Sequence, residues 1–197
     1  MKKLLPIIIC ILVILVLLIT VPIFIKNIQK ENVISLFEKT KTYTNIVIYD
    51  NLNKSEISYY QGIHINKSSD YILHSDLNTG IVHNINTKDK TCYISKEKLH
   101  ELSTISVDLK SLSELDVLYR TKLSDLSFSK EMYNDVNCIT YTYNNTTVYV
   151  HPENGLVLKI CFSDDDYTVF TYDYKLNSLT AEDMSVPDLT DYKVENM

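Results

Sequence analysis

The sequence predicts an α+β fold, in which a curled antiparallel half-barrel sheet is covered by one or two helices and preceded by a single N-terminal transmembrane helix. Three observations predict it. Apolar and polar residues alternate through residues 136–174, leucines recur at helical spacing in residues 109–119, and residues 4–25 carry no charge. Alternation indicates strands with one buried face, whereas a spacing of three to four residues indicates an amphipathic helix.

The uncharged run predicts the transmembrane helix. As a helix it is about 33 Å long, enough to cross a hydrocarbon core of about 30 Å. It is longer than the apolar region of a cleaved signal peptide, and no Ala-x-Ala cleavage site follows it, so we expect residues 1–26 to be an uncleaved anchor. Pro6 and Pro22 lie near its two ends, where a helix tolerates proline best.

The orientation of this anchor follows from its lysines. Lys2 and Lys3 favour a cytoplasmic N-terminus, whereas several lysines after residue 25 favour the reverse. Long domains are translocated largely regardless of charge, so the short N-terminus should decide. We expect residues 27–197 to form one extracytoplasmic domain on a single-pass protein of the cell membrane.

The first half of this domain should be mostly strands. Residues 32–41 predict a short helix that buries Val33, Leu36 and Phe37. Strand-like runs, separated by Asn, Asp, Gly, Lys and Ser, then occupy residues 44–50, 55–66, 69–75, 80–86 and 90–95.

Two helical stretches interrupt the strands. Ser95 can cap a turn that carries Leu99 and Leu102, and Asp108 can cap a helix that extends to Arg120. The second stretch carries a stripe at helical spacing: Leu109, Leu112, Leu115, Leu118 and Tyr119. A leucine stripe next to an uncovered sheet face is most simply the cover of that face.

The strands resume at residues 124–132 and continue as an antiparallel meander through residue 174. Its turns are Asn144-Asn145, Pro152-Glu153-Asn154-Gly155 and Asp164-Asp165-Asp166. The apolar set falls on one face: Ile139, Tyr141, Tyr143, Val148, Val150, Leu156, Leu158, Ile160, Phe162, Phe170, Tyr172 and Tyr174. Thr and charged residues take the other face, so one face is solvated and the other needs a cover. The tail, residues 184–197, should run along the surface in extended form.

This apolar face and the leucine stripe define the candidate lining of a cavity. The residues are Leu112, Leu115, Tyr141, Tyr143, Leu158, Ile160, Phe170 and Tyr172. The chain has 15 Tyr and no Trp, and Tyr favours strands for structural reasons alone. Amphipathic tyrosine rings also suit a cavity or an interface, which is the functional alternative.

Charge and cysteines limit the classes of partner. Residues 1–26 hold three of the 19 basic side chains and none of the 25 acidic ones, which leaves the outer domain at a net charge of about −9. An acidic domain disfavours nucleic acid and anionic headgroups as partners. Three cysteines lie in this domain, Cys92, Cys138 and Cys161, and we expect three free thiols because the last two are separated by an intervening strand.

The sequence contains no motif that predicts catalysis, a metal or a cofactor. His64, His74 and His83 lie on successive strand-like runs, but no carboxylate or thiol has a fixed ligand spacing to them. The three aspartates of residues 164–166 lack the glycine-containing pattern of a calcium loop. G-x-S-x-G, HExxH, P-loop and G-x-G-x-x-G motifs are absent. We therefore expect a non-enzymatic protein without catalytic, cofactor or metal-binding residues.

Four stretches carry a resemblance to a known family. They are the leucine-rich DLKSLSELDVLYR, then CITYTYN, the strand–turn–strand TVYVHPENGLVLKICF, and the proline-containing VPDLTDYKV. Together they resemble the LolA/RseB-like superfamily, the outer-membrane lipoprotein carrier-like proteins, in a membrane-anchored bacterial version. The resemblance implies an open half-barrel of antiparallel strands around helices.

The same resemblance implies two functions. Some members of the superfamily carry lipoprotein acyl chains in the cavity, and others bind stress-response partners in the envelope. A related clostridial germination lipoprotein is the partner of a cell-wall amidase in the modification of the spore cortex during sporulation and germination. We expect a membrane-tethered accessory or regulatory partner of a protein of the bacterial cell envelope. The alternative is a carrier or sensor of lipid or lipoprotein acyl chains.

Overall fold

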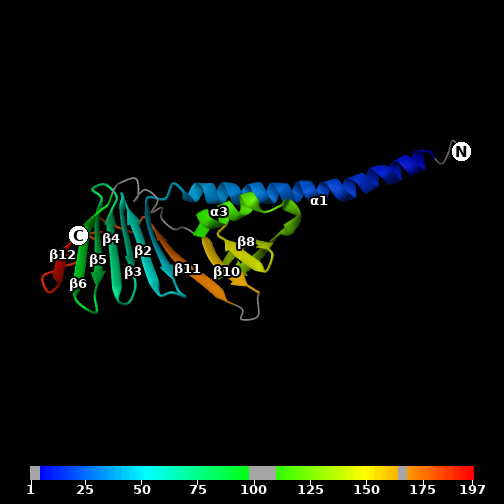
Figure 1. The fold of residues 1–197 in the computed structure, drawn as a ribbon. Helices are drawn as coiled ribbons and strands as arrows, with labels where there is room; N and C mark the ends of the chain where they lie inside the picture. The colour runs from blue at the N-terminus through cyan, green and yellow to red at the C-terminus, as the bar shows by residue number, and fades with distance from the viewer. Residues whose placement is uncertain (1–4, 98–109, 164–167) are drawn as a thin grey trace.

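The computed structural model describes residues 5–97, 110–163 and 168–197 (Figure 1). They form one large, open, curled sheet of twelve strands, with helices on one of its faces. The predicted α+β fold with a helix-covered antiparallel sheet is confirmed.

The sheet is antiparallel except at one edge. Its spatial order is β12-β6-β5-β4-β3-β2-β1-β11-β10-β9-β8-β7, and β12 pairs with β6 in parallel. The strands are β1 (Asn45–Asp50), β2 (Ser55–Tyr60), β3 (Ile63–Lys67), β4 (Tyr71–Asp76), β5 (Ile81–Asn86), β6 (Thr91–Lys96), β7 (Leu126–Tyr133), β8 (Val136–Tyr143), β9 (Thr146–Val150), β10 (Val157–Phe162), β11 (Val169–Leu176) and β12 (Lys193–Asn196).

Strand β11 joins two meanders into this sheet. Its residues 169–171 pair with β10, whereas its residues 172–176 pair with β1. The meanders β1–β6 and β7–β10 are thus joined edge to edge in one sheet through β11, although nearly 120 residues separate β1 from β11. Figure 1 shows the two meanders diverging on either side of β11.

The turns use asparagine and other non-glycine residues, as the scarcity of glycine predicts. Among the described residues, seven that are not glycine have a positive φ: Lys54, Gln61, Lys90, Asn134, Asp135, Asn144 and Asn177. One turn corrects a prediction. Residues 55–66 are not one strand but a hairpin of β2 and β3, because Gln61 (φ 48) and Gly62 (φ 85) turn the chain over.

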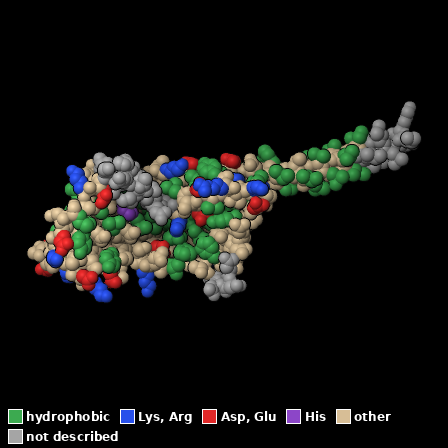
Figure 2. All heavy atoms as spheres, viewed as in Figure 1, with side chains coloured by type: hydrophobic (Ala, Val, Ile, Leu, Met, Phe, Trp, Pro, Cys, Tyr) green, Lys and Arg blue, Asp and Glu red, His purple; other side chains and the backbone are tan. Residues whose placement is uncertain are grey.

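Helix α1 (Leu5–Thr40) is one helix of 36 residues. The expectation of a separate short helix over residues 32–41 is wrong, because nothing breaks the helix after the apolar run. For the same reason Pro22 lies inside the helix rather than at its end. Among the described residues α1 is long and apolar enough to span a membrane. Figures 1 and 2 show its apolar half projecting from the domain.

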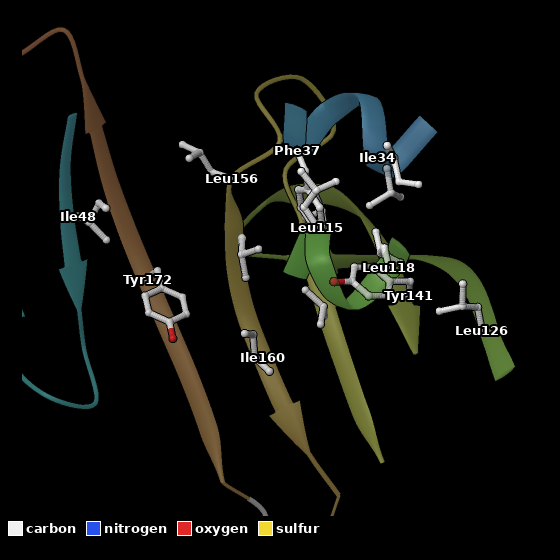
Figure 3. Close-up of a cluster of buried hydrophobic side chains, with 14 of the residues drawn as sticks. Ile34, Phe37, Ile48, Leu115, Leu118, Leu126, Tyr141, Leu156, Ile160 and Tyr172 are labelled. Carbon is white, nitrogen blue, oxygen red and sulfur yellow. The ribbon is translucent and has the colours of Figure 1, made fainter. Parts of the chain in front are cut away.

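The second half of α1 packs on the sheet together with α3 (Lys110–Arg120). Val33 and Phe37 of α1 and Leu118 of α3 have no exposed surface, and Leu115 is 4% exposed (Figure 3). The ring of Phe37 meets that of Tyr141 edge to face at 6.2 Å between centroids. We call this side of the sheet the helix face. The predicted leucine cover is present, and α1 supplies a second helix to it.

A β-bulge changes the predicted alternation of β10. The pairing of β10 with β9 shifts register between Val157 and Lys159. Val157 therefore joins the core with no exposed surface, and Leu158 lies outside the buried cluster. The expectation that Leu158 shares the face of Leu156 and Ile160 fails at this one residue.

The C-terminal tail covers the other face of β1–β6, which we call the tail face. His74 of β4 bonds through Nε2 to the carbonyl oxygen of Met184 at 2.9 Å, and Met184 is 1% exposed. The Asn45 side chain makes two further bonds to the backbone of Leu179. The expectation that the tail runs along the surface in extended form is wrong in part, because the tail turns at residues 181–184 and 190–191, buries Met184 and ends as the edge strand β12.

A few predictions fall outside the described residues. They are the turn with Leu99 and Leu102, the cap at Asp108 with the first leucine of the stripe, Leu109, and the hairpin tip at residues 164–166. The start of β7 also differs from expectation, since a 3-10 turn, η1 (Leu123–Asp125), precedes it.

Candidate binding site

A pocket of about 280 Å³ lies where β11 leaves β10 to pair with β1. We call it the fork pocket. The bulge at Leu158 produces it, because pairing between β10 and β11 ends at Lys159 and Thr171. The residues that line it are Tyr133, Asn134, Val136, His151, Asn154, Leu156, Leu158, Tyr172, Asp173 and Tyr174.

One wall of the fork pocket is a turn held by both helices. Gly155 has φ +73, and a Cβ atom there would lie 2.2 Å from the carbonyl oxygen of Leu36 in α1. Ser111 of α3 donates a hydrogen bond to the carbonyl oxygen of Gly155, and Tyr43 donates one to that of Asn154. The turn of residues 152–155, predicted from its Pro and Gly, is therefore a fixed part of the pocket.

The fork pocket has polar and apolar surface in similar amounts, and its polar groups include donors and acceptors. Nδ1 of His151 accepts a hydrogen bond from the Glu153 N–H, so a neutral His151 carries its proton on Nε2. Asp173 offers a carboxylate, which also accepts a hydrogen bond from Asn51. The Tyr174 hydroxyl donates to the Val157 carbonyl oxygen, and burial raises its pKa well above the ordinary value. Such a lining suits an amphipathic side chain of a partner.

The eight residues predicted to line a cavity separate into three groups. Leu115, Tyr141 and Ile160 lie in the buried core, and Leu112, Tyr143 and Phe170 pack against it. Leu158 lines the fork pocket, and Tyr172 belongs both to the core and to the fork pocket. The helix face near these side chains is thus occupied by α1 and α3 rather than left open.

Glu114 is a buried acid that the sequence pattern did not single out. It lies on α3 at 7% exposure and accepts hydrogen bonds from the hydroxyls of Tyr141 (2.7 Å) and Tyr143 (3.1 Å). Burial raises the pKa of Glu114, and the two hydroxyls partly oppose that rise. Its spacing of four residues from Leu118 could have placed it on the buried side of the helix. Glu114 is not among the residues that line the fork pocket.

The histidines lie on both faces of the sheet. His74 and His83 are cross-strand neighbours on the tail face, with ring centroids 5.5 Å apart, whereas His64 lies on the helix face next to Ser75. Within the described part of the chain, the Nδ1 atoms of all three and the Ser75 hydroxyl are buried and have no hydrogen-bond partner, whereas Nε2 of His74 bonds to Met184. Burial lowers the pKa of His64 and of His83. Within the described ranges, no group of three or more His, Cys, Asp or Glu side chains could hold a metal.

A second pocket of about 430 Å³ lies at the ends of β1–β3. Its lining includes Asp50, Lys54, Glu56 and Lys67, with charges of both signs at the surface. All four cysteines are free thiols, and Cys92, Cys138 and Cys161 are buried. Burial raises the pKa of the Cys92 and Cys138 thiols, which disfavours the reactive thiolate form.

Comparisons with known proteins do not identify a family for this chain. No family model and no curated protein matches the chain. Among solved structures, the chain is similar to an uncharacterised conserved protein from Thermus thermophilus, with a TM-score of 0.40, 12% sequence identity, and coverage of 85% of this chain and 98% of that chain. At this TM-score the likeness carries no conclusion about function, so any proposal rests on the chain's own residues.

Proposed function

We propose that this protein is a membrane-tethered, non-catalytic binding protein. Its domain lies outside the cytoplasm and acts as an accessory or regulatory partner of a protein of the cell envelope. The fork pocket is the place where it receives a side chain of that partner. The proposal includes the LolA/RseB-like relationship, which the four sequence stretches support.

The observation that carries this proposal is the occupied helix face. A carrier of acyl chains needs an open apolar cavity, yet Phe37, Leu115 and Leu118 fill the space between the helices and the sheet. Apolar volume that is already packed at the density of a protein interior offers no room for a lipid chain. The fork pocket, at about 280 Å³, is too small for a long acyl chain, and its lining includes the polar groups of His151, Asn154 and Asp173.

The charge of the domain and its membrane anchor indicate what kind of partner it binds. The net charge of about −9 on residues 27–197 favours a basic partner and accelerates encounter at low salt. A common membrane raises the effective concentration of two tethered proteins, so modest affinity suffices. A cell-wall hydrolase is the first candidate, by the resemblance to the clostridial germination lipoprotein.

Affinity capture with the full chain in lipid nanodiscs tests the proposal. The bait is the wild-type chain, and Leu158→Asp places a second carboxylate in the fork pocket without touching the core. Leu52→Asp is the matched control, because Leu52 is 49% exposed on the β1–β2 turn. We expect one envelope protein to be retained by the wild type and by Leu52→Asp, released by high salt, and lost with Leu158→Asp.

Two results would point elsewhere. If captured lipoproteins depend on their acyl chains, or if mass spectrometry finds lipid bound to the purified chain, the carrier alternative holds. Orientation is tested separately by adding protease to intact protoplasts, where a domain protected from digestion would contradict the extracytoplasmic placement.

A further inference from the structure

We propose that a rigid helix, rather than a flexible linker, holds the domain in one orientation on the membrane. In this orientation the β7 edge of the sheet and the α3–β7 connection lie against the lipid headgroups. This inference rests on the proposed membrane anchor and adds a defined surface for the bilayer. It also sets the height of each part of the domain above the membrane.

The first argument is that one helix belongs to both the anchor and the domain. No break separates the apolar half of α1 from the half that packs in the core. Val33, Ile34 and Phe37 are at most 8% exposed, whereas Phe24 and Ile28 are 66% and 52% exposed. A continuous helix fixes the orientation of the domain relative to the anchor, whereas a glycine- or serine-rich linker would leave that orientation free.

The second argument is a set of polar contacts that fixes α1 against the domain just after the apolar run. The Lys26 ammonium donates a hydrogen bond to the Ser124 carbonyl oxygen at 3.2 Å, and that of Lys30 to the Thr121 carbonyl oxygen at 2.9 Å. Further along, the Tyr119 hydroxyl donates to Glu38 at 3.1 Å. These contacts tie the end of α3 and the following turn to α1 where the apolar run ends.

The third argument is the direction of the sheet. Figure 1 shows the strands crossing the direction of α1, with β8 and β10 on the side of the N-terminus and β6 and β12 at the far end. The strand order β7 to β12 therefore leads away from the membrane, and strands about 4.8 Å apart put β12 at most roughly 50 Å from β7, the path length along the curled sheet. Figure 2 shows apolar side chains along the projecting helix and charged ones over the domain.

These arguments place the membrane surface near Lys26. The uncharged run before it supplies about 20 apolar residues, the length that a hydrocarbon core requires. Ser124 and its neighbours Thr121 and Lys122 then lie at headgroup level, beside the β7 edge. Among the described strands, β7 has no second partner on this side, and the bilayer surface would shield its free edge from pairing with another chain. A bend at Pro22 would change the tilt of the spanning part but not this order of heights.

Single tryptophans test the orientation, because the chain has none of its own. Lys122→Trp lies on the exposed α3–β7 connection, and Tyr93→Trp replaces a 38% exposed ring on β6. Each full-length variant is placed in vesicles with and without a lipid that carries a nitroxide on its headgroup. We expect several-fold stronger quenching of the tryptophan at position 122 than of the one at position 93.

A glycine variant separates orientation from anchoring. Asn27→Gly, Ile28→Gly and Gln29→Gly together loosen the helix between anchor and domain, and the matching triple alanine variant preserves it. The difference in quenching should shrink in the glycine variant and persist in the alanine variant. Equal quenching at both positions, in protein that floats with the vesicles, overturns the orientation alone. Failure to float overturns the anchor itself.

Discussion

At the scale of single residues, Glu114 is a buried acid whose pKa is raised by burial. An acid with a raised pKa keeps its proton to higher pH in the folded than in the unfolded chain. Its contribution to stability is therefore fully present below the ordinary value of 4.5 and is lost as the pH rises through the folded pKa. The hydroxyls of Tyr141 and Tyr143 limit this loss because they donate to the carboxylate.

The Glu114→Gln variant should lose this pH dependence. We expect its free energy of unfolding to fall less than that of the wild type between about pH 4.5 and pH 7, because the neutral amide has no proton to release. Tyr143→Phe should have the opposite effect, since it removes a bond that stabilises the carboxylate. Denaturant unfolding at several pH values measures both, and parallel curves for the wild type and Glu114→Gln would contradict the assignment.

The glycines of the turns give a second residue-scale prediction. Gly155 and Gly62 both have a positive φ, but a Cβ at Gly155 meets backbone of α1, whereas one at Gly62 meets the movable side chain of Asn78. Gly155→Ala should cost about 3 kcal/mol, strain and clash together, and Gly62→Ala about 1 kcal/mol. Unfolding midpoints compare the two, and equal losses would mean that the contact with α1 is not maintained.

At the scale of elements, α1 combines two environments in one helix. Phe37 is fully buried against Tyr141, whereas Phe24 is 66% exposed. Phe37→Ala should therefore destabilise the domain by about 4 kcal/mol, while Phe24→Ala should leave its unfolding unchanged. Chemical unfolding in one detergent, followed by circular dichroism, measures both losses. A similar effect of the two substitutions would mean that α1 is not part of the core.

Periodicity in the sequence predicted elements where it was regular. The meander strands and the leucine helix were found because each has one clear period, and the apolar helix was found because its run is long and uncharged. The long-range events were not predictable: the pairing of β1 with β11, the continuity of α1 and the parallel strand β12 depend on contacts between distant residues. In the sequence, Leu158 fits the alternation of its neighbours, so no local pattern marks the bulge. The turn at Gln61-Gly62 was missed because it contains neither proline nor asparagine.

The candidate site was predictable only in part. Leu158 and Tyr172 were among the predicted lining residues, but the sequence placed them on a continuous apolar face rather than at a fork between strands. Glu114 was missed because one acid within a helix pattern is usually solvated. The fork itself follows from β11 changing partners, and no local pattern carries that information.

At the scale of the whole molecule, the chain uses its two ends to complete the sheet. The second half of α1 and α3 pack on the helix face of β7–β11, and the C-terminal tail crosses the tail face of β1–β6 and pairs as β12. Each meander is thereby covered on a different face by a segment of the same chain.

Removal of the tail, residues 177–197, should expose Cys92. Its thiol has no exposed surface and lies on the tail face beside β12, where Val194 pairs with it. We expect a water-soluble maleimide to leave Cys92 unlabelled in the wild type in nanodiscs and to label it in the truncated chain, while Cys138 and Cys161 on the other meander stay protected. Met184→Asp should act in the same direction by charging the buried contact with His74. Peptide mapping identifies the labelled thiol, and a truncated chain that keeps its circular dichroism while Cys92 remains unreactive would show that the tail does not cover this face.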